Sequence, residues 1–451
     1  MLREMRIQGF KSWRDTGNIR MAPITAFFGP NSSGKSSIIQ FLLMLKQTVD
    51  SLDRNQVLNF GDEKTLVELG TFQDVLFSKG GVQAESLKFD MAYTFDEDRS
   101  FEESGESYEK VSAKFGVELV SNKRGAPEVE MIEHESYGYS YRLSKSDMAN
   151  EWECSVSIDS TDTGNRSVMT GRNIRGPEKF YKFNAAVGDF SLTDTLFADT
   201  LSDFESCFSS IYHLGPLRDY PRRQYIWGGS APSDMGRRGE NVVAALLASQ
   251  RTDQDEPATQ STGVRLDECV ASWLKRLSLV EEFGVEEIAP GSNLYRAWVK
   301  RGRGSARVPL TDVGFGVSQV LPVITSCFYV PERSTMIFEQ PEIHLHPAVQ
   351  SGLADVFVEA TSKRDIQVIV ESHSEHLLQR LQRRIAEGVL SPDDVALYFC
   401  DHEDGESRIS ELAIDEYGNI ANWPKDFFGD EFGELAAITE AQMTRKMASK
   451  A

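Results

Sequence analysis

One segment constrains the fold of this chain more than any other: residues 29–36 read G-x-x-x-x-G-K-S. The apolar run 24–28 precedes the segment, and a second apolar run, 38–45, follows it. Glycines in such a loop let backbone N–H groups close around phosphate oxygens, and the N-terminus of the next helix adds the positive end of its dipole. The order strand, glycine-rich loop, helix therefore predicts a phosphate-binding loop in an α/β fold.

The residues of this loop have separate predicted tasks. Lys35 would reach the β- and γ-phosphates of a nucleoside triphosphate, and the Ser36 hydroxyl would hold Mg²⁺. ATP and Mg²⁺ are thus the predicted ligands. The complete predicted nucleotide-binding set in this loop is Gly29, Pro30, Asn31, Ser32, Ser33, Gly34, Lys35, Ser36 and Ser37.

Length and composition exclude several other classes of protein. A chain of 451 residues is longer than one compact core usually requires, so we expect about two or three structural units. The formal net charge of −21 disfavours a general polyanion binder. No stretch approaches the roughly 20 apolar residues of a membrane span. Five cysteines without a CxxC pair are typical of a reducing cytosol, so we expect a cytoplasmic protein without zinc.

Three later segments carry further groups suited to a nucleotide site. The apolar run 335–338 ends in Glu339, which we expect to face Mg²⁺ across from Ser36. The β-branched run 366–370 leads to His373, whose neutral imidazole would contact the γ-phosphate or the attacking water. The third segment begins a helix, where glycines make an anion-binding end for a γ-phosphate held by a second subunit. Its candidate residues are Gly314, Gly316 and Ser318.

Taken in order, these motifs resemble the ATPase head of ABC-type proteins, found in SMC proteins, DNA-end-processing complexes and OLD-family proteins. The segments E-Q-P-E-I-H-L-H-P (339–347) and E-S-H-S-E-H-L-L (371–378) are similar to those of stand-alone bacterial "AAA family" ATPases. Several relatives act in anti-phage defence, as in the Septu system, where the ATPase partners a separate nuclease or toxin. The resemblance implies a P-loop NTPase with a mostly parallel sheet flanked by helices, an antiparallel β-rich insertion and a helical subdomain.

The chain departs from the ABC pattern at one catalytic position. Most ABC ATPases have Asp-Glu where this chain has Glu339-Gln340, and a glutamine cannot accept a proton as a carboxylate does. Gln340 can still orient water, as a glutamine does in some GTPases. Two interpretations stay open: full turnover assisted by His373, Glu371 or Glu342, or slow hydrolysis that leaves long-lived ATP-bound dimers.

The resemblance and the change in texture along the chain divide it into five segments. Residues 1–80 and 307–390 are assigned to the two parts of the ATPase head. Residues 81–189 are expected to form the β-rich insertion, because their apolar positions alternate with period two. Residues 190–306 are expected to form a helical and loop subdomain, and residues 391–451 a C-terminal segment that binds a partner.

Three functional hypotheses follow. The first is a homodimer or larger homo-oligomer that ATP closes and that regulates a separate effector, a nuclease or toxin, in anti-phage defence. The second is a DNA-repair or DNA-end ATPase; the acidic charge favours contact with nucleic acid through the partner instead. The third is a nuclease within the chain, for which the acidic run 401–404 is the candidate. His344 and His346 could mimic metal ligands together with Glu342, but the resemblance places this segment next to the nucleotide site, and no Cys or further Asp joins it.

Overall fold

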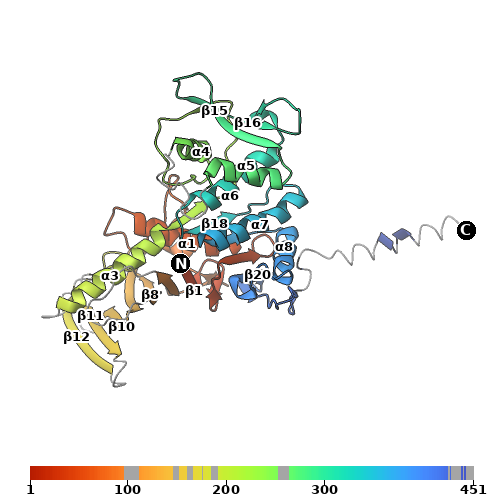
Figure 1. The fold of residues 1–451 in the computed structure, drawn as a ribbon. Helices are drawn as coiled ribbons and strands as arrows, with labels where there is room; N and C mark the ends of the chain where they lie inside the picture. Colours follow the sequence, from red (N-terminus) through yellow and green to blue (C-terminus); the bar gives the residue numbers. More distant parts are fainter. Residues whose placement is uncertain are drawn as a thin grey trace, which may run out of the picture.

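The computed structural model describes residues 1–95, 111–145, 152–159, 166–174, 176–183, 191–251, 264–424, 427, 438–439 and 441–442. A mostly parallel sheet lies at its centre (Figure 1). Its strands, in spatial order, are β13 (Ile211–Leu214), β18 (Thr335–Glu339), β19 (Gln367–Glu371), β4 (Ile24–Phe28), β20 (Val395–Glu403) and β21 (Glu406–Glu411). The pairs from β13 to β20 are parallel, and β21 returns antiparallel beside β20.

Both faces of this sheet are buried, which explains its continuous apolar strands. In β4, Ile24, Ala26 and Phe28 belong to one core cluster, whereas Phe27 belongs to the other. The same alternation divides β18, where Phe338 and Ile337 face opposite sides. Because side chains alternate along a strand, two apolar faces require an unbroken apolar run.

Helices pack against the two faces. The first core cluster is formed with helices α4 (Val242–Arg251), α5 (Leu266–Arg276), α6 (Phe315–Tyr329), α7 (Pro347–Arg364) and α8 (Glu375–Ala386). The second is formed with helix α1 (Lys35–Asp50), the short α2 (Phe72–Val75) and the C-terminal half of α3 (Ser191–Ser209). The predicted fold class, an α/β P-loop ATPase head with added β-rich and helical parts, is confirmed.

The β-rich part is one large antiparallel sheet packed on the second core cluster. Figure 1 shows α3 lying along it while β10–β12 extend away from the centre. The strands, in spatial order, are β12 (Arg166–Ile174), β11 (Trp152–Asp159), β10 (Tyr139–Lys145), β9 (Pro127–Ser136), β8 (Val111–Ser121), β7 (Ser86–Phe95), β1 (Leu2–Phe10) and β2 (Trp13–Asp15), with β3 (Ile19–Arg20) beside β1.

The first strand of the chain lies in this antiparallel sheet and not in the parallel one. Strand β1 pairs with β7 from Leu2–Tyr93 to Gln8–Lys88. The sheet therefore runs across the boundary that we expected near residue 80. A strand with alternating burial can pair with any matching edge, so its local sequence does not choose its sheet.

The segment 190–306, which we expected to consist of helices and loops, also contains β-strands. Strand β13 belongs to the central sheet, and a small antiparallel sheet follows. The small sheet contains β14 (Tyr225–Ile226), β16 (Leu294–Lys300), β15 (Glu282–Glu287) and β17 (Val308–Pro309). A separate hairpin pairs β5 (Ser78–Lys79) with β6 (Val82–Gln83). None of the helices in the described ranges is long and apolar enough to cross a membrane.

Candidate functional site

The phosphate loop connects β4 to α1, as its sequence predicts. Gly34 immediately precedes the helix and has φ +98°, and Gly29 at the start of the loop has φ +134°. Ser32 between them also has a positive φ, +63°. Left-handed backbone at three positions turns the chain sharply enough to bring several N–H groups to one side.

Neighbouring strands require glycine at both ends of this loop. An ideal Cβ on Gly29 would lie 2.0 Å from the carbonyl oxygen of Cys400 in β20. A Cβ on Gly34 would lie 2.5 Å from Ser407 Oγ in β21. The hairpin β20–β21 therefore packs directly against the phosphate loop, a contact that the loop sequence does not reveal.

The lysine of the loop is folded back on it. Lys35 Nζ donates to the carbonyl oxygens of Gly29 at 2.9 Å and Pro30 at 2.7 Å. Burial lowers the pKa of this ammonium, while the nearby Glu371 and Glu342 act against that shift. A buried cation held by two carbonyls is available to exchange them for phosphate oxygens, which are stronger acceptors.

A hollow of about 210 Å³ opens over the loop, and it gathers residues from both ends of the sequence. Gln340, Glu371 and His373 border it from the ends of β18 and β19. The rest of the lining comes from Ser12 and from the phosphate loop with the start of α1, namely Asn31, Ser32, Ser33, Gly34, Lys35, Ser36 and Ser37. Parallel strands end at the same sheet edge, so their following residues converge above the loop.

Glu371 makes the closest carboxylate contact with the loop. Ser36 Oγ donates to Glu371 Oε1 at 2.9 Å. Burial raises the pKa of Glu371 to about 7, and the neighbouring Glu339 acts in the same direction, while the Ser36 hydroxyl and Lys35 oppose the shift. The prediction from sequence placed Glu339 opposite Ser36; the hydroxyl instead contacts the carboxylate on the next strand.

Glu339 is held from the other side. Its Oε1 lies 2.7 Å from Nε2 of His213, which β13 delivers from the neighbouring position in the sheet. Arg218, in the loop after β13, is also buried, and Nη2 lies 3.5 Å from the Glu339 carbonyl oxygen. Burial lowers the pKa of Arg218 to about 10, while Glu339 and Glu342 attract its charge. The sequence interpretation gave neither His213 nor Arg218 a role at the site, because only the strand order brings them beside Glu339.

Two further contacts shape the edge beside the loop. The backbone N–H of His373 donates to Glu342 Oε1 at 2.6 Å, which fixes the start of the turn after β19. Burial, followed by the charge of Lys35, lowers the pKa of the His373 imidazole, favouring its neutral form. Gln340 has φ +44° and donates its backbone N–H to the Glu371 carbonyl oxygen at 2.8 Å. Such sparsely populated backbone is concentrated at functional sites.

The residues of the third motif lie elsewhere. Gly314 is the N-cap of α6, and no described atom lies within 4 Å of an ideal Cβ built on it. For Gly316 the nearest described atom is Leu345 Cδ2 at 3.8 Å. Ser318 Oγ donates to the Phe315 carbonyl oxygen at 2.7 Å. Within one chain these residues do not line the hollow at the phosphate loop.

The two histidines of the H-L-H-P segment make structural contacts. His346 caps α7 by accepting from the backbone N–H of Ala348 at 3.3 Å. The His344 ring packs edge-on against Phe315, with 5.6 Å between centroids. Among the described residues, no group of three or more His, Cys, Asp or Glu side chains could hold a metal ion.

The acidic run 401–404 forms the end of the β20–β21 hairpin. Asp404 has φ +54° in its turn, and Glu403 pairs with Arg408 across the strands. These residues are exposed. The run is therefore a solvated turn, as the sequence interpretation favoured over a nuclease centre.

The sheet edge above the phosphate loop carries the oxygen ligands that Mg²⁺ prefers, namely one hydroxyl and carboxylates. Glu371 is 3 % exposed, and its Oε2 has no hydrogen-bond partner among the residues that the structure describes. The same holds, within those ranges, for Oε2 of Glu342. A buried carboxylate oxygen without a partner is unfavourable, so the site fits a cation. Phosphate oxygens and water supply the remaining ligands of such a site, which needs no cluster of three protein side chains.

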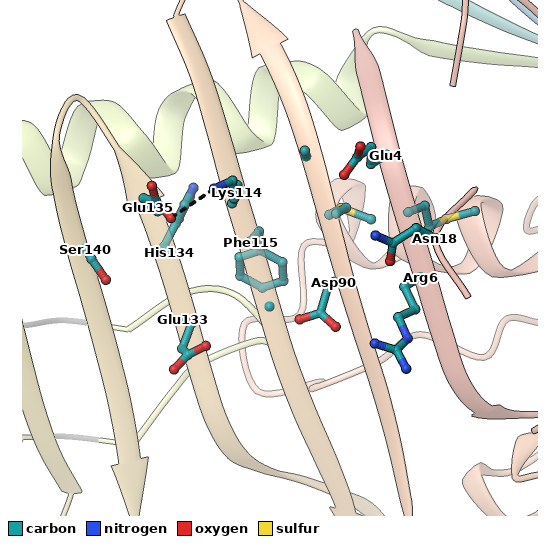
Figure 2. Close-up of a pocket in the computed structure, with 14 residues that line it drawn as sticks. Glu4, Arg6, Asn18, Asp90, Lys114, Phe115, Glu133, His134, Glu135 and Ser140 are labelled. Atoms are coloured by element: carbon teal, nitrogen blue, oxygen red, sulfur yellow. Dashed lines mark hydrogen bonds and ion pairs between the residues drawn. The ribbon is translucent and has the colours of Figure 1, made fainter. Parts of the chain in front are cut away.

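A larger hollow, of about 450 Å³, lies on the antiparallel sheet (Figure 2). Its walls carry charged side chains from β1, β7, β8 and β9. Several are paired with each other or with neighbours: Lys114 lies 3.5 Å from Glu135, and Arg6 lies 2.6 Å from Asp15. The charges of these pairs balance each other on the sheet surface.

Sequence families match the two ends of the chain. Residues 1–151 match the family described as "AAA ATPase domain", and residues 265–379 match "AAA domain, putative AbiEii toxin, Type IV TA system". These matches, with the loop and strand order above, support an ATPase domain of the AAA type. Residues 390–438 match "Protein of unknown function (DUF3696)". No curated protein matches the chain.

Solved structures similar to this chain include three SMC heads. An SMC head bound to the C-winged helix domain of ScpA has 12% identity and a TM-score of 0.47, covering 92% of this chain and 98% of its own. The SMC head domain from Thermotoga maritima has 13% identity, a TM-score of 0.43 and coverage of 92% and 99%. A Smc head domain from Pyrococcus furiosus with an extended coiled coil, bound to the C-terminal domain of ScpA, has 12% identity and a TM-score of 0.46. The match covers 91% of this chain and 96% of that one. The fold assignment rests on this chain's own strand order and phosphate loop.

Proposed function

We propose that this protein binds Mg-ATP at the phosphate loop and hydrolyses it. The observation that carries the proposal is the hollow over the loop, where Lys35 and Ser36 meet Gln340, Glu371 and His373. Loop N–H groups and Lys35 would bind the phosphates, and Ser36 with a carboxylate at the sheet edge would hold Mg²⁺. When bound, Mg²⁺ neutralises charge that develops on the phosphate oxygens.

The catalytic assignments follow from what each side chain can do. Gln340 would orient the attacking water, since an amide accepts and donates hydrogen bonds but does not take up a proton. Neutral His373 would contact the γ-phosphate or that water. Glu339, held by His213, belongs to the same catalytic set. Because Gln340 replaces a general base, we favour slow hydrolysis, on the order of 10²–10⁴ below a carboxylate-assisted rate.

We further propose that ATP joins two copies of the chain. The N-terminus of α6 has no side-chain cap, and the space around Gly314 is open among the described residues. The free N–H groups of the first turn can therefore donate hydrogen bonds to an anion from outside the chain. Exposed apolar side chains lie at the start of this helix, where Phe315 is 42 % exposed, and in the loop after β13, where Leu217 is 66 % exposed. Tyr220 packs against the Phe315 ring at 5.4 Å. Such a patch beside an anion-binding end favours a second subunit that carries the phosphate.

The output that we propose is regulation of a separate nuclease or toxin effector in anti-phage defence. Support comes from the family matched by residues 265–379, whose description includes a toxin of a toxin–antitoxin system. The C-terminal segment packs on the phosphate loop through β20 and β21, so it can transmit the nucleotide state. Its exposed Tyr417, at 68 %, is suited to contact a partner.

The first test separates binding from assembly. Lys35→Ala should abolish binding of a fluorescent ATP analogue, and unchanged binding would refute the site. Gly316→Arg should keep nucleotide binding but prevent ATP-dependent dimerisation in sedimentation velocity, since a Cβ at this position would make only an ordinary van der Waals contact within the monomer, with Leu345 Cδ2 at 3.8 Å. A protein that stays monomeric with ATP would refute the assembly.

The second test concerns output. Tagged protein is purified from its host with and without ATP, with Lys35→Ala as the matched control. A nuclease or toxin that co-purifies only with nucleotide-bound wild-type protein supports the effector proposal. Recovery of DNA that high salt removes would instead support direct action on nucleic acid. Gln340→Glu should raise turnover, and no gain would favour assistance by the other groups.

A further inference from the structure

The strand order places one carboxylate nearer to the phosphate loop than the other. Strand β19 lies between β18 and β4, so its last residue, Glu371, is next to the strand that enters the loop. Glu339 ends β18, one strand further away, and the two glutamates are direct neighbours in the parallel register. Any cation that Ser36 binds is therefore flanked first by Glu371.

The hydrogen bonds of the two glutamates separate their roles further. Glu371 Oε1 accepts from Ser36, and its buried Oε2 has no partner among the described residues. Glu339 Oε1 is already engaged by His213, 2.7 Å away on the far side. Of these two glutamates, Glu371 is the one that contacts the predicted Mg²⁺-binding hydroxyl and also has a buried carboxylate oxygen without a hydrogen-bond partner in the described part of the chain.

We infer that Glu371, and not Glu339, is the protein carboxylate that binds Mg²⁺ together with Ser36 when ATP is present. The inference rests on the proposed function, since the ion arrives with the nucleotide. The Ser36–Glu371 hydrogen bond then joins two groups that both turn their oxygens to the cation. Hard Mg²⁺ prefers such oxygens and is usually held by one or two carboxylates plus phosphates. Glu339, which the proposed function places in the catalytic set, then acts through its neighbour: tied to His213, it positions Gln340 instead of binding the ion.

The test compares Glu371→Gln with Glu339→Gln, which make the same carboxylate-to-amide replacement. The affinity for a fluorescent ATP analogue is measured in Mg²⁺ and in EDTA. For wild-type protein, Mg²⁺ should tighten binding. Glu371→Gln should lose about tenfold or more of this tightening, while binding in EDTA stays the same. Glu339→Gln should keep most of the tightening, although its turnover falls.

The result that overturns the inference is the reverse pattern, in which Glu339→Gln loses the Mg²⁺ effect and Glu371→Gln keeps it. Equal losses in both variants would also overturn it, because the two glutamates would then share the ion. Failure of wild-type protein to bind the analogue at all would instead refute the proposed function. Circular dichroism checks that each variant is folded; a glutamine at 371 can still accept the Ser36 hydrogen bond.

A second readout does not depend on fluorescence. Mn²⁺ replaces Mg²⁺, and the free ion is counted by electron paramagnetic resonance in the presence of a non-hydrolysable ATP analogue. Glu371→Gln should release about tenfold more Mn²⁺ at the same protein concentration than Glu339→Gln does. Equal free Mn²⁺ for the two variants would contradict the assignment.

Discussion

The C-terminal end of the phosphate-loop helix provides a quantitative test of the structure. Lys179, only 5 % exposed, donates from Nζ to the carbonyl oxygens of Thr48 at 2.7 Å, Val49 at 2.9 Å and Ser51 at 2.8 Å. The last carbonyls of a helix have no partner within it, and a cation there also favours the negative end of the dipole. Lys179 thus holds the segment 176–183 against the end of α1.

The change proposed is Lys179→Met, which keeps the apolar stem and removes the three donors. Each buried acceptor left without a partner costs about 1–3 kcal/mol. Burying the Lys179 ammonium is itself unfavourable, as its lowered pKa indicates. Removing this charge therefore offsets part of the cost of the unpaired carbonyls. Water can also reach some carbonyls at a helix end. We therefore expect the free energy of unfolding to fall by about 3 kcal/mol.

The assay is equilibrium unfolding in urea, followed by circular dichroism and tryptophan fluorescence. The matched control is Lys182→Met, three residues away, whose side chain is 40% exposed and pairs with Glu205 at 3.2 Å. Loss of such an exposed pair costs about 0–1 kcal/mol. If the two variants lost equal stability, the three carbonyl contacts would not stabilise the helix end and the reasoning would be refuted.

Further predictions concern a buried histidine, a loop glycine and its control. Burial lowers the pKa of His134 to about 3 from an unfolded value near 6.5, so the unfolded chain binds more protons between these values. Stability contributed by neutral His134 is complete above pH 6.5 and falls as the pH drops towards 3, by about 2 kcal/mol at pH 5. The free energy of unfolding in urea is measured at pH 7.5 and at pH 5. His134→Gln, whose side chain can still form a hydrogen bond with Tyr93, should lose less stability between the two pH values than the wild-type protein, by about 2 kcal/mol. An equal loss in both proteins would contradict the lowered pKa of His134. Gly29→Ala should abolish ATP-analogue binding or soluble expression, because its Cβ would meet a backbone oxygen at 2.0 Å. Gly388→Ala, also at positive φ but in open space among the described residues, should cost only about 1–2 kcal/mol and leave binding intact; equal effects would rule out the steric cause.

Much of the phosphate loop could be predicted because its determinants are local. The apolar strand, the two glycines and the helix are contiguous, and their steric and hydrogen-bonding requirements act over a few residues. The period-two pattern likewise predicted strands in the segments that became β7, β8 and β11.

The positions of the groups around the loop could be predicted less well. Glu371 is 335 residues from Ser36 in the chain, and their hydrogen bond depends on β19 entering the sheet between β18 and β4. From the sequence, Glu339 and Glu371 are both acidic residues at the ends of apolar strands. Which one faces the loop is a property of strand order, and strand order is set by long-range packing.

By itself, then, the sequence determined the elements that depend on short-range sterics: the loop, its glycines, the flanking strand and helix, and the buried character of the central strands. The tertiary structure decided which strands are neighbours. As a result, β1 lies in the antiparallel sheet, and β20 and β21 pack against the phosphate loop. The same strand order brings His213 to Glu339 and Ser36 to Glu371. The physical reason is that an apolar strand can pair with many edges, and only the packing of both sheet faces selects one of them.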